Sequence, residues 1–360
     1  MVKDDLGYTA KQRLIDFVGM IDSRLETFWD KEIARSFGFN SGQKELVKVI
    51  LEHAKEHNLR TGKRLRGSFV YYAYLLGNMR VDESIWRACE AVEIVHTALL
   101  MHDDFMDQDD LRRGKPTTHN YFSKGDGHYG DVMAVNVGDS VLCLGFERLI
   151  ESGFDASLVN KSMSQLLRGI TNTAFGQAYD VSLPKKRDLT SESVLALHTA
   201  KTAIYTYENP LFIGGILGGL SSGVLKILHE YSMSGGVAFQ LQDDILGVFG
   251  NEEDTGKSNN SDILQGKVTL LITKALEVGS DDQKKEILKV WGNKTSKNED
   301  IEKAKNAIKE CGSYDYSVNT AKSMAMEAAS WAGKLRSFDL NKEAIDYLEG
   351  IAMYMVERKV

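Results

Sequence analysis

The stretch "SIWRACEAVEIVHTALLMHDDFMDQ", residues 84–108, decides which fold the chain is expected to adopt. Apolar residues recur along it at spacings of three and four, and it contains no proline, so it predicts one long helix. The end of this helix is acidic: five aspartates fall within positions 103–110, and two arginines and a lysine follow them. Carboxylates that project from an apolar helix are better explained by a ligand than as solvated surface.

The rest of the chain is expected to be helical for the same reason. Pro116, Pro184 and Pro210 are the only prolines among 360 residues, so long segments can form uninterrupted helices. The same apolar spacing occurs at 133–152, 190–208, 225–249 and 314–335. No run alternates as the strands of a sheet do, which predicts an all-α fold with about ten or more helices. Without a low-complexity linker or a repeat of fixed period, a single domain over residues 1–360 is expected.

Composition and charge exclude several classes of protein. The net charge of -7 argues against a general nucleic-acid binder, so an anionic ligand must be held by a local basic cluster. The three cysteines lie far apart without CxxC spacing, which indicates neither a disulfide framework nor a thiolate metal site. The N-terminus is acidic where a signal peptide needs an apolar run, and the apolar stretch 210–220 is too short to span a bilayer. A soluble cytoplasmic protein without stable membrane insertion is expected.

The aspartates form two separate groups. Asp103 and Asp107 are four positions apart and therefore share one helix face, which His96, seven residues before Asp103, also shares. Two carboxylates one turn apart suit Mg²⁺, which takes one or two carboxylates and completes its shell with water and substrate phosphates. A second pair, Asp243 and Asp244, lies in "FQLQDDILGVFG" between apolar residues. Two such acidic helix ends facing each other across a cleft would need cations between them.

Basic residues indicate what those cations would help to bind. Arg112 and Arg113 follow the first acidic cluster, and "TGKRLRG" at 61–67 is basic as well. Guanidinium groups match phosphate oxygens in pairs, and lysine acts as a point charge. The basic positions considered are Lys63, Arg64, Arg66, Arg112, Arg113, Lys201, Lys257 and Lys267. The sequence therefore predicts one or more diphosphates as ligands.

With these motifs in place, the chain resembles the trans-isoprenyl diphosphate synthases, the polyprenyl synthetase family of farnesyl and geranylgeranyl diphosphate synthases. The resemblance runs from about residue 45 to the C-terminus. Its pieces occur in the family's order: "GKRLRG" (62–67), "VHTALLMHDDFMDQDDLRRGKPT" (95–117), "GD" (138–139), "GQAYD" (176–180), "KTA" (201–203), "FQLQDDILG" (239–247), "TGK" (255–257) and "SDILQGK" (261–267). A lone DDxxD motif would be a weak signal, whereas this ordered set is specific.

The resemblance implies a fold and an activity. The fold is the all-α isoprenoid synthase fold, with helices around a central cavity, and the protein is expected to be a homodimer. The activity is that of a prenyltransferase, which joins an allylic diphosphate head to tail to isopentenyl diphosphate and releases diphosphate. Three Mg²⁺ ions are expected in each site.

The resemblance also assigns roles to residues. Asp103 and Asp107 are expected to bind two Mg²⁺ ions, and Asp243 a third. The allylic diphosphate would be held by Arg112, Lys201, Lys257 and Lys267, with help from Thr202 and Gln240. The isopentenyl diphosphate would be held by Lys63, Arg66, His96 and Arg113. Asp104, Asp244, Asp262 and Lys267 would act through neighbouring groups or metal-bound water.

The expected mechanism follows from these charges. The allylic C–O bond ionises to a delocalised carbocation, which an apolar, closed cavity protects from water. The double bond of isopentenyl diphosphate then attacks the cation. No side chain is an obvious general base, so the departing diphosphate is expected to remove the final proton, while Thr202 and Gln240 steady the positive charge.

Three positions bear on how this chain differs within the family. Gly247 stands where many members have a third aspartate in the second motif. Ala98 and Leu99, five and four residues before Asp103, are expected to face the channel that receives the growing chain. Because Ala98 replaces the aromatic floor of members that stop early, geranylgeranyl diphosphate or a longer product is expected. The candidate floors lie deeper, at Val95, Met133 and Val137.

Other functions stay open at this stage. Within the family, the product could have 25 or more carbons, or could be farnesyl diphosphate. The His102–Asp103 pair could belong to an HD-type metal phosphohydrolase, which would need further histidine ligands around one centre. A class I terpene cyclase shares the first motif but has a different second metal motif, and a synthase-like subunit could bind without catalysis. The charged region 279–312 is expected to be a solvated helical pair.

Overall fold

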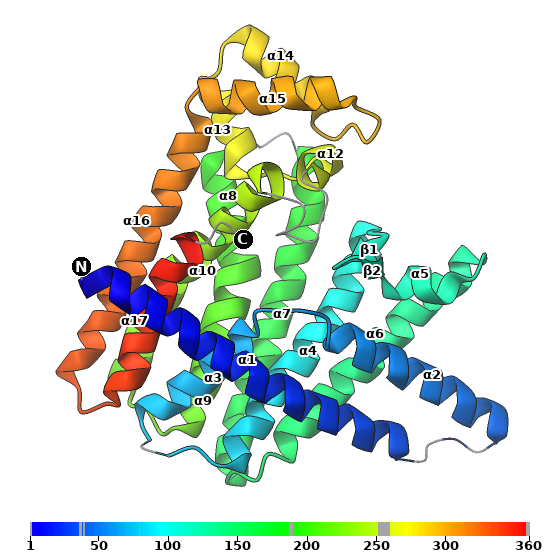
Figure 1. Cartoon of the computed structure of the whole chain (residues 1–360), viewed down its shortest axis with the longest axis vertical. Coiled ribbons are helices and arrows are strands. Elements are labelled where there is room, and N and C mark those ends of the chain that lie inside the picture. The colour runs from blue at the N-terminus through cyan, green and yellow to red at the C-terminus, as the bar shows by residue number, and fades with distance from the viewer. Residues whose placement is uncertain are drawn as a thin grey trace. The chain divides into compact units, whose positions relative to one another are not determined.

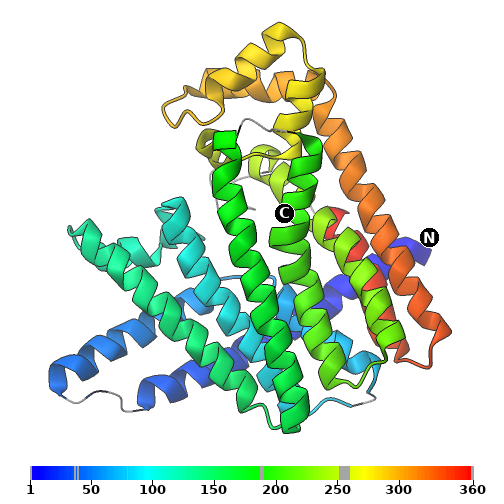
Figure 2. The ribbon, with the colours of Figure 1, turned by 180° about the vertical axis from the view of Figure 1, so that it is seen from behind.

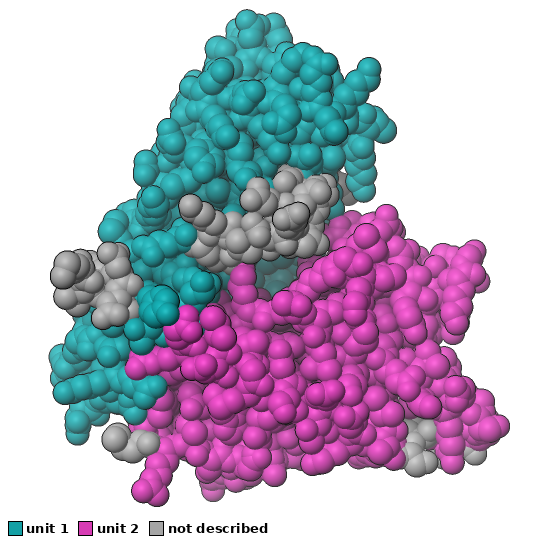
Figure 3. All heavy atoms as spheres, viewed as in Figure 1, with its two compact units in different colours: residues 1–11, 165–212, 220–360 teal, residues 12–164, 213–219 magenta. Residues whose placement is uncertain are grey.

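The computed structural model describes residues 2–35, 38, 40–78, 80–186, 190–250 and 260–357. Almost all of the described elements are helices, which confirms the expected all-α fold (Figure 1). The strands among the described residues form one two-stranded hairpin. The chain separates into two compact units, shown in two colours in Figure 3. That the whole chain acts as a single domain stays a prediction.

Unit 2, which is magenta in Figure 3, comprises residues 12–164 and 213–219. Its elements are α1 (Val2–Ala34, whose first residues belong to the other unit), α2 (Ser41–Asn58), α3 (Leu65–Leu76), α4 (Glu83–Asp107), β1 (Leu111–Arg112), β2 (Lys115–Pro116), α5 (Thr118–Ser123) and α6 (Gly127–Ile150). Helix α1 buries a stripe at spacings of three and four, which includes Phe17, Ile21 and Leu25. Within α4, the expected helix 84–108 is confirmed to within one residue at each end.

Helices α4 and α6 lie side by side in both views of the ribbon (Figures 1 and 2). Glycines make this close packing possible. A β-carbon at Gly145 would lie 2.6 Å from Cγ2 of Val95, and one at Gly138 would overlap the ring of His102. The two glycines are seven residues apart, as are Val95 and His102 in the opposite order, so the helices run antiparallel with α6 pressed against the helix of the first acidic motif.

Unit 1 comprises residues 1–11, 165–212 and 220–360. Its elements are α7 (Ala156–Lys186, which begins in unit 2), α8 (Ser191–His198), the π-helix η1 (Thr199–Glu208), α9 (Asn209–Leu217, which ends in unit 2), α10 (Ser222–Phe249), α12 (Ser261–Gln265), α13 (Leu270–Val278), α14 (Asp281–Val290), α15 (Asn298–Glu310), α16 (Ser313–Lys334), the 3-10 helix η2 (Leu335–Ser337) and α17 (Lys342–Glu357). Helix α10, which carries the second acidic motif, packs against α16, α17 and η1.

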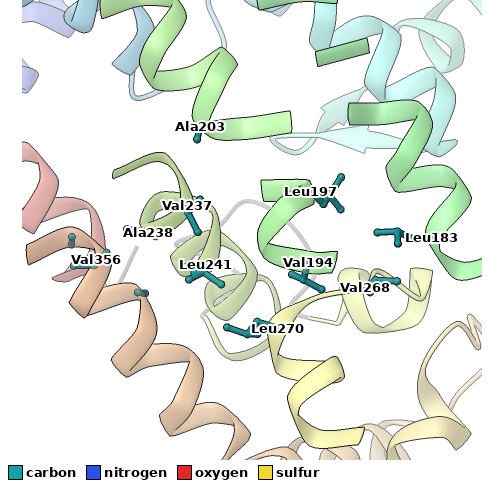
Figure 4. Packing of buried hydrophobic residues seen from close by; sticks show 12 residues of the cluster. Leu183, Val194, Leu197, Ala203, Val237, Ala238, Leu241, Val268, Leu270 and Val356 are labelled. Atoms are coloured by element: carbon teal, nitrogen blue, oxygen red, sulfur yellow. The ribbon is translucent and has the colours of Figure 1, made fainter. Parts of the chain in front are cut away.

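The core of unit 1 surrounds α10. Figure 4 shows Val237 and Leu241 of α10 packed with Val194 and Leu197 of α8 and with Leu270 of α13. A second cluster buries one face of α14 and α15 against α10 and α13. The region 279–312 is therefore a helical pair, as expected, although each of its helices has a buried apolar face.

The segment 190–208 is not one regular helix, because its second half is a π-helix. Glycines on two neighbouring helices allow these helices to approach η1 closely. A β-carbon at Gly176 of α7 would lie 3.0 Å from Cα of Lys201, and one at Gly236 of α10 would overlap Ala203. π-Helical turns are rare and often occur at functional sites. The tight packing therefore fixes the backbone that carries Lys201 and Thr202.

Within the described ranges, no helix combines the length and the apolar character that crossing a membrane requires.

Candidate active site

The first acidic motif occupies the last turn of α4. The helix ends at Asp107, and Gln108 follows in the left-handed conformation with φ of 55°. Because the C-terminus of a helix carries partial negative charge, carboxylates there are unfavourable unless cations compensate them. Asp103, Asp104 and Asp107 all lie in this turn. The local structure thus requires positive charge at this point.

The three carboxylates have different surroundings. Asp104 is fully buried, and Nε of Arg112 donates to its Oδ1 at 2.6 Å and its Oδ2 at 2.8 Å. Burial alone would raise the pKa of Asp104, but the nearby His57 and the hydrogen-bonded Arg112 outweigh it, so the pKa lies below its ordinary value. Asp103 and Asp107 are partly exposed. They are accessible to a cation, whereas Asp104 serves to hold Arg112.

The donor set on α4 fits Mg²⁺. Asp103 and Asp107 present hard carboxylate oxygens one turn apart, and Mg²⁺ takes one or two carboxylates together with water and phosphate oxygens. Nowhere in the part of the chain that the structure describes do three or more His, Cys, Asp or Glu side chains lie together as a ready-made metal site. A substrate with oxygen ligands of its own would therefore complete the shell.

A tight hairpin places the two adjacent arginines. Strands β1 and β2 pair around Arg113 and Gly114, which have φ of 53° and 73°, as a type I′ turn requires. A non-glycine residue in this left-handed region is uncommon, so Arg113 is held there by its surroundings. Arg60 stabilises the hairpin, because its guanidinium donates to the carbonyl oxygens of Arg112 at 3.3 Å and Pro116 at 2.9 Å.

The residues predicted to bind isopentenyl diphosphate gather in the same unit. Arg66 lies 2.9 Å from His96, measured from Nη1 to Nε2. Burial lowers the pKa of His96 well below its ordinary value, and Arg66, Arg113 and Arg112 lower it further. A neutral His96 accepts the hydrogen bond from Arg66. The imidazole therefore adds no positive charge to the arginines around it.

Arg113 completes this basic cluster. Burial lowers its pKa to about 10, and Arg112 and Arg64 act in the same direction. Its Nη1 donates to the carbonyl oxygen of Arg60 at 2.9 Å, and Gly62 leaves the room that this guanidinium needs. A bound anion would relieve the repulsion among the arginines. Lys63, which follows Gly62, is exposed.

The first arginine of "GKRLRG" has a different, structural role. Arg64 is buried, and its guanidinium donates to Asp22 at 2.7 Å and to the carbonyl oxygen of Asn58 at 2.6 Å. It therefore ties α3 to α1 and α2. Sequence alone cannot separate this arginine from Arg66, because both stand in the same basic run.

The second motif in unit 1 repeats the arrangement of the first. Asp243 is partly exposed, whereas Asp244 is buried and engaged with protein groups. Gln240 donates from Nε2 to Oδ1 of Asp244 at 2.9 Å and accepts at Oε1 from the hydroxyl of Thr202 at 2.8 Å. Nε2 of His198 lies 3.1 Å from the other oxygen of Asp244. In both motifs the first aspartate is accessible and the second positions its neighbours.

Two further contacts in unit 1 concern predicted residues. Nζ of Lys201 donates to Oδ2 of Asp180 on α7 at 2.8 Å. Nζ of Lys267 lies 2.9 Å from Oδ1 of Asp262, and a β-carbon at Gly247 would overlap the same carboxylate. These carboxylates hold the two lysines in place.

Four residues beside the site were not predicted from the sequence, and one predicted residue lies outside the part of the chain that the structure describes. The structure adds Arg60, His57, Asp180 and His198 to the surroundings of the site. Asp180 had a signal, since it ends the matching piece "GQAYD". Lys257 lies outside the described residues. Each half of the predicted site is assembled within its own unit.

Most of the candidate chain-length residues are buried on α4 and α6. Ala98 and Val95 are fully buried, Leu99 is partly exposed, and Met133 and Val137 of α6 are buried. Val95 fills the notch that Gly145 leaves. That the growing product passes these residues stays a prediction.

Comparisons with known proteins identify the family of the chain. The family model of the polyprenyl synthetases matches residues 48–308. The chain is 36% identical over 314 residues to a geranylgeranyl diphosphate synthase from Saccharolobus solfataricus, covering 86% of this chain and 90% of the relative. It is 31% identical over 313 residues to a geranylfarnesyl diphosphate synthase from Aeropyrum pernix, covering 86% and 94%. Its fold resembles a geranylgeranyl pyrophosphate synthase from Corynebacterium glutamicum, in complex with isoprenyl diphosphate and magnesium, with a TM-score of 0.87, 27% identity and coverage of 95% and 98%.

Proposed function

From the fact that the chain belongs to the polyprenyl synthetase family, and is thus a prenyltransferase, we propose that it makes geranylgeranyl diphosphate. It would do so by condensing isopentenyl diphosphate head to tail with allylic diphosphates. The observation that carries the proposal is that unit 2 joins an accessible carboxylate pair on α4, Asp103 and Asp107, to a basic cluster around His96. One helix thus supplies groups for a metal-bound diphosphate and for a second diphosphate.

The residues of the chain have distinct parts in this reaction. Asp103, Asp107 and Asp243 would hold Mg²⁺, for which we propose three ions. When bound, Mg²⁺ would act as a Lewis acid that stabilises negative charge on the departing diphosphate. Arg112 and Lys201 would donate to the allylic diphosphate, and each is paired with a carboxylate before the substrate binds. Once these donors face the bound diphosphate, they would lower the barrier to ionisation because they need no further rearrangement during bond cleavage.

The second substrate is bound and oriented by the basic cluster. Lys63, Arg66 and Arg113 would donate to the isopentenyl diphosphate, and a neutral His96 would fix the guanidinium of Arg66. Thr202 donates its only hydroxyl proton to Gln240, so its oxygen lone pairs can face developing positive charge on the allylic carbons. The departing diphosphate would take the final proton. Lys257 and Lys267 would contribute further positive charge.

A second product length has support from a specific observation. Ala98 is small and fully buried, so no aromatic floor stands at this level of α4. A relative from Aeropyrum pernix bears the name geranylfarnesyl diphosphate synthase. A product of 25 carbons is therefore the alternative. We also propose a homodimer, a single functional domain and a cytoplasmic location, the last because the three cysteines show no disulfide spacing.

The hydrolase alternative has less support. Nε2 of His102 lies 3.3 Å from Oδ1 of Asp139, and its ring packs at Gly138. The HD-type reading needs several histidines around one metal. Among the described residues, no group of three His, Cys, Asp or Glu side chains is arranged in this way around His102.

A product assay tests the proposal. Purified protein, Mg²⁺ and isopentenyl diphosphate are incubated with dimethylallyl, geranyl or farnesyl diphosphate, and the products are measured by mass spectrometry. A product ladder that ends at 20 carbons supports the proposal, and one that ends at 25 supports the alternative. Chelation of Mg²⁺ and Asp103→Ala should each abolish condensation. Asp110→Ala is the matched control, because Asp110 is exposed and lies beyond the end of α4.

The remaining outcomes separate the other functions. Release of diphosphate without a longer prenyl product would indicate a hydrolase or a cyclase. No turnover with any primer, together with weak Mg²⁺ binding, would indicate a binding subunit. Equal loss in Asp103→Ala and Asp110→Ala would contradict the assignment of the metal site to one face of α4.

A further inference from the structure

His57 on α2 is a buried polar residue that the mechanism above does not use. Its side chain is 1% exposed, and neither ring nitrogen has a hydrogen bond of normal length among the described residues. Buried polar groups in folded proteins almost always have a partner, so an exception calls for an explanation. The ring faces a specific group: Nε2 of His57 lies 3.7 Å from Oδ2 of Asp104. This distance is just beyond hydrogen-bond length.

Asp104 is already paired with Arg112, which is also proposed to bind the allylic diphosphate. Arg112 donates from Nε to both carboxylate oxygens of Asp104 and also lies 3.7 Å from Oδ2 of Asp103. In the proposed function, Arg112 donates to the allylic diphosphate. A guanidinium that turned to phosphate oxygens would give up part of its contact with Asp104. A fully buried carboxylate left without hydrogen bonds would oppose that turn, because its desolvation would be uncompensated.

We propose that His57 is a positioning residue, which donates from Nε2 to Oδ2 of Asp104 when Arg112 turns to the diphosphate. The inference rests on the proposed role of Arg112. A movement of about 1 Å would close the present gap to hydrogen-bond length. Asp104 would then be paired both before and after the substrate binds, and Arg112 would be released without leaving a buried, unsatisfied carboxylate.

The surroundings of His57 fit a neutral donor. Burial lowers the pKa of His57 despite its closeness to Asp104, and the positive charges of Arg60 and Arg112 act in the same direction as burial. A neutral imidazole has one N–H, which in this geometry belongs on Nε2. Such a ring can donate to Asp104 without adding a competing charge to the arginine cluster.

The same helix offers a matched control. His53 lies one turn before His57, is also buried, and has a partner of its own, with Nε2 3.1 Å from Oγ1 of Thr118. Its substitution removes a buried imidazole from α2 that packs edge-on against His57 but is hydrogen-bonded to Thr118 and not to Asp104. The comparison therefore separates a general effect on α2 from an effect that passes through Asp104.

The test measures binding of inorganic diphosphate in the presence of Mg²⁺ by calorimetry, together with both KM values and the melting temperature. His57→Leu should weaken diphosphate binding and raise the KM for the allylic substrate, each about tenfold, as expected for one lost buried hydrogen bond. The KM for isopentenyl diphosphate should stay within about twofold, and the melting temperature should not fall. His57→Gln, which keeps an N–H donor, and His53→Leu should both bind diphosphate like the unaltered protein.

Two further variants make the outcome decisive. In an Asp104→Asn background, His57→Leu should cause no additional loss, because residues that act through one contact are not additive. If Arg112→Leu leaves diphosphate binding unchanged, the proposed role of Arg112 fails and the inference fails with it. If Arg112→Leu weakens binding but His57→Leu does not, the inference alone is overturned. Equal losses in His57→Leu, His57→Gln and His53→Leu would also overturn it.

Discussion

Gly247 on α10 leaves open the space that the carboxylate of Asp262 on α12 fills. A β-carbon at position 247 would overlap Oδ2 of Asp262, whose Oδ1 lies 2.9 Å from Nζ of Lys267. The glycine in the second motif therefore has a structural reason, since a carboxylate from another helix already occupies this place.

This relationship predicts a compensating pair of substitutions. Gly247→Asp should lower the free energy of unfolding by about 1–3 kcal/mol, because two side chains would compete for one space. The double variant Gly247→Asp with Asp262→Gly should recover most of that loss. Chemical denaturation measures both, with Asp262→Gly alone as the reference. A Gly247→Asp protein as stable as the unaltered chain would contradict the packing described here.

Substitution of Ala98 should change the product. Ala98→Phe would place a ring at a fully buried position of α4, five residues before Asp103, where we expect the growing chain to pass. Products should shorten toward farnesyl diphosphate, and Ala98→Val should give an intermediate distribution. Mass spectrometry of the products with dimethylallyl diphosphate as primer measures the effect. An unchanged distribution in a folded Ala98→Phe protein would place the channel elsewhere.

The close approach of α10 to the π-helix predicts a sensitive glycine. Gly236→Ala should destabilise the protein by about 1–3 kcal/mol and lower activity, because its β-carbon would overlap Ala203, next to Lys201 and Thr202. Gly19→Ala on α1 is the control, since a β-carbon there meets nothing within 4 Å. It should stabilise the protein by about 0.4–1 kcal/mol. Melting curves and turnover of both variants test the pair, and equal effects would contradict it.

Stability should fall as the pH decreases below about 6.5. Burial lowers the pKa of His53 from 6.5 to about 3, and the neighbouring His57 and Arg60 act in the same direction. Between these values the unfolded chain binds a proton that the folded chain does not, so the free energy of unfolding decreases by up to about 1.4 kcal/mol per pH unit from this residue. Above pH 6.5 neither state is protonated, and the contribution to pH dependence vanishes.

The His53→Gln variant isolates this effect. Denaturation of both proteins at pH 7.5, 6 and 5 should show a smaller pH dependence in the variant. A constant difference between the two proteins at all three values would mean that His53 does not resist protonation in the folded state. The lost contact with Thr118 changes only the size of the offset, because it does not titrate.

Relationships within one helix could be predicted from the sequence. Asp103 and Asp107 share a face of α4 because they are four residues apart, and the same spacing joins Gln240 to Asp244 on α10. The family resemblance then supplied the roles of these residues. Helix periodicity also predicted the segment 190–208, but it could not reveal the π-helix within it. The irregularity lies where Gly236 of α10 approaches Ala203 closely, a tertiary contact that periodicity does not reveal.

Relationships between elements could not be predicted in the same way. Arg64 and Arg66 look alike in "GKRLRG", yet Arg64 is buried against Asp22 and the carbonyl of Asn58, while Arg66 contacts His96. His57 gave no signal at all, because nothing in the sequence indicates that α2 places it beside Asp104.

The sequence by itself determined the helices, the family and the residue types of the site, because helical spacing and ordered motifs are local properties of the chain. Tertiary structure alone decided which charges are buried and which are accessible. Asp104 and Asp244 became positioning groups, and Asp103 and Asp243 stayed accessible, because burial and hydrogen bonding depend on neighbours that are distant in sequence or lie across a turn. The same physical reason explains Gly247: the need for a glycine arises from Asp262, which belongs to another helix.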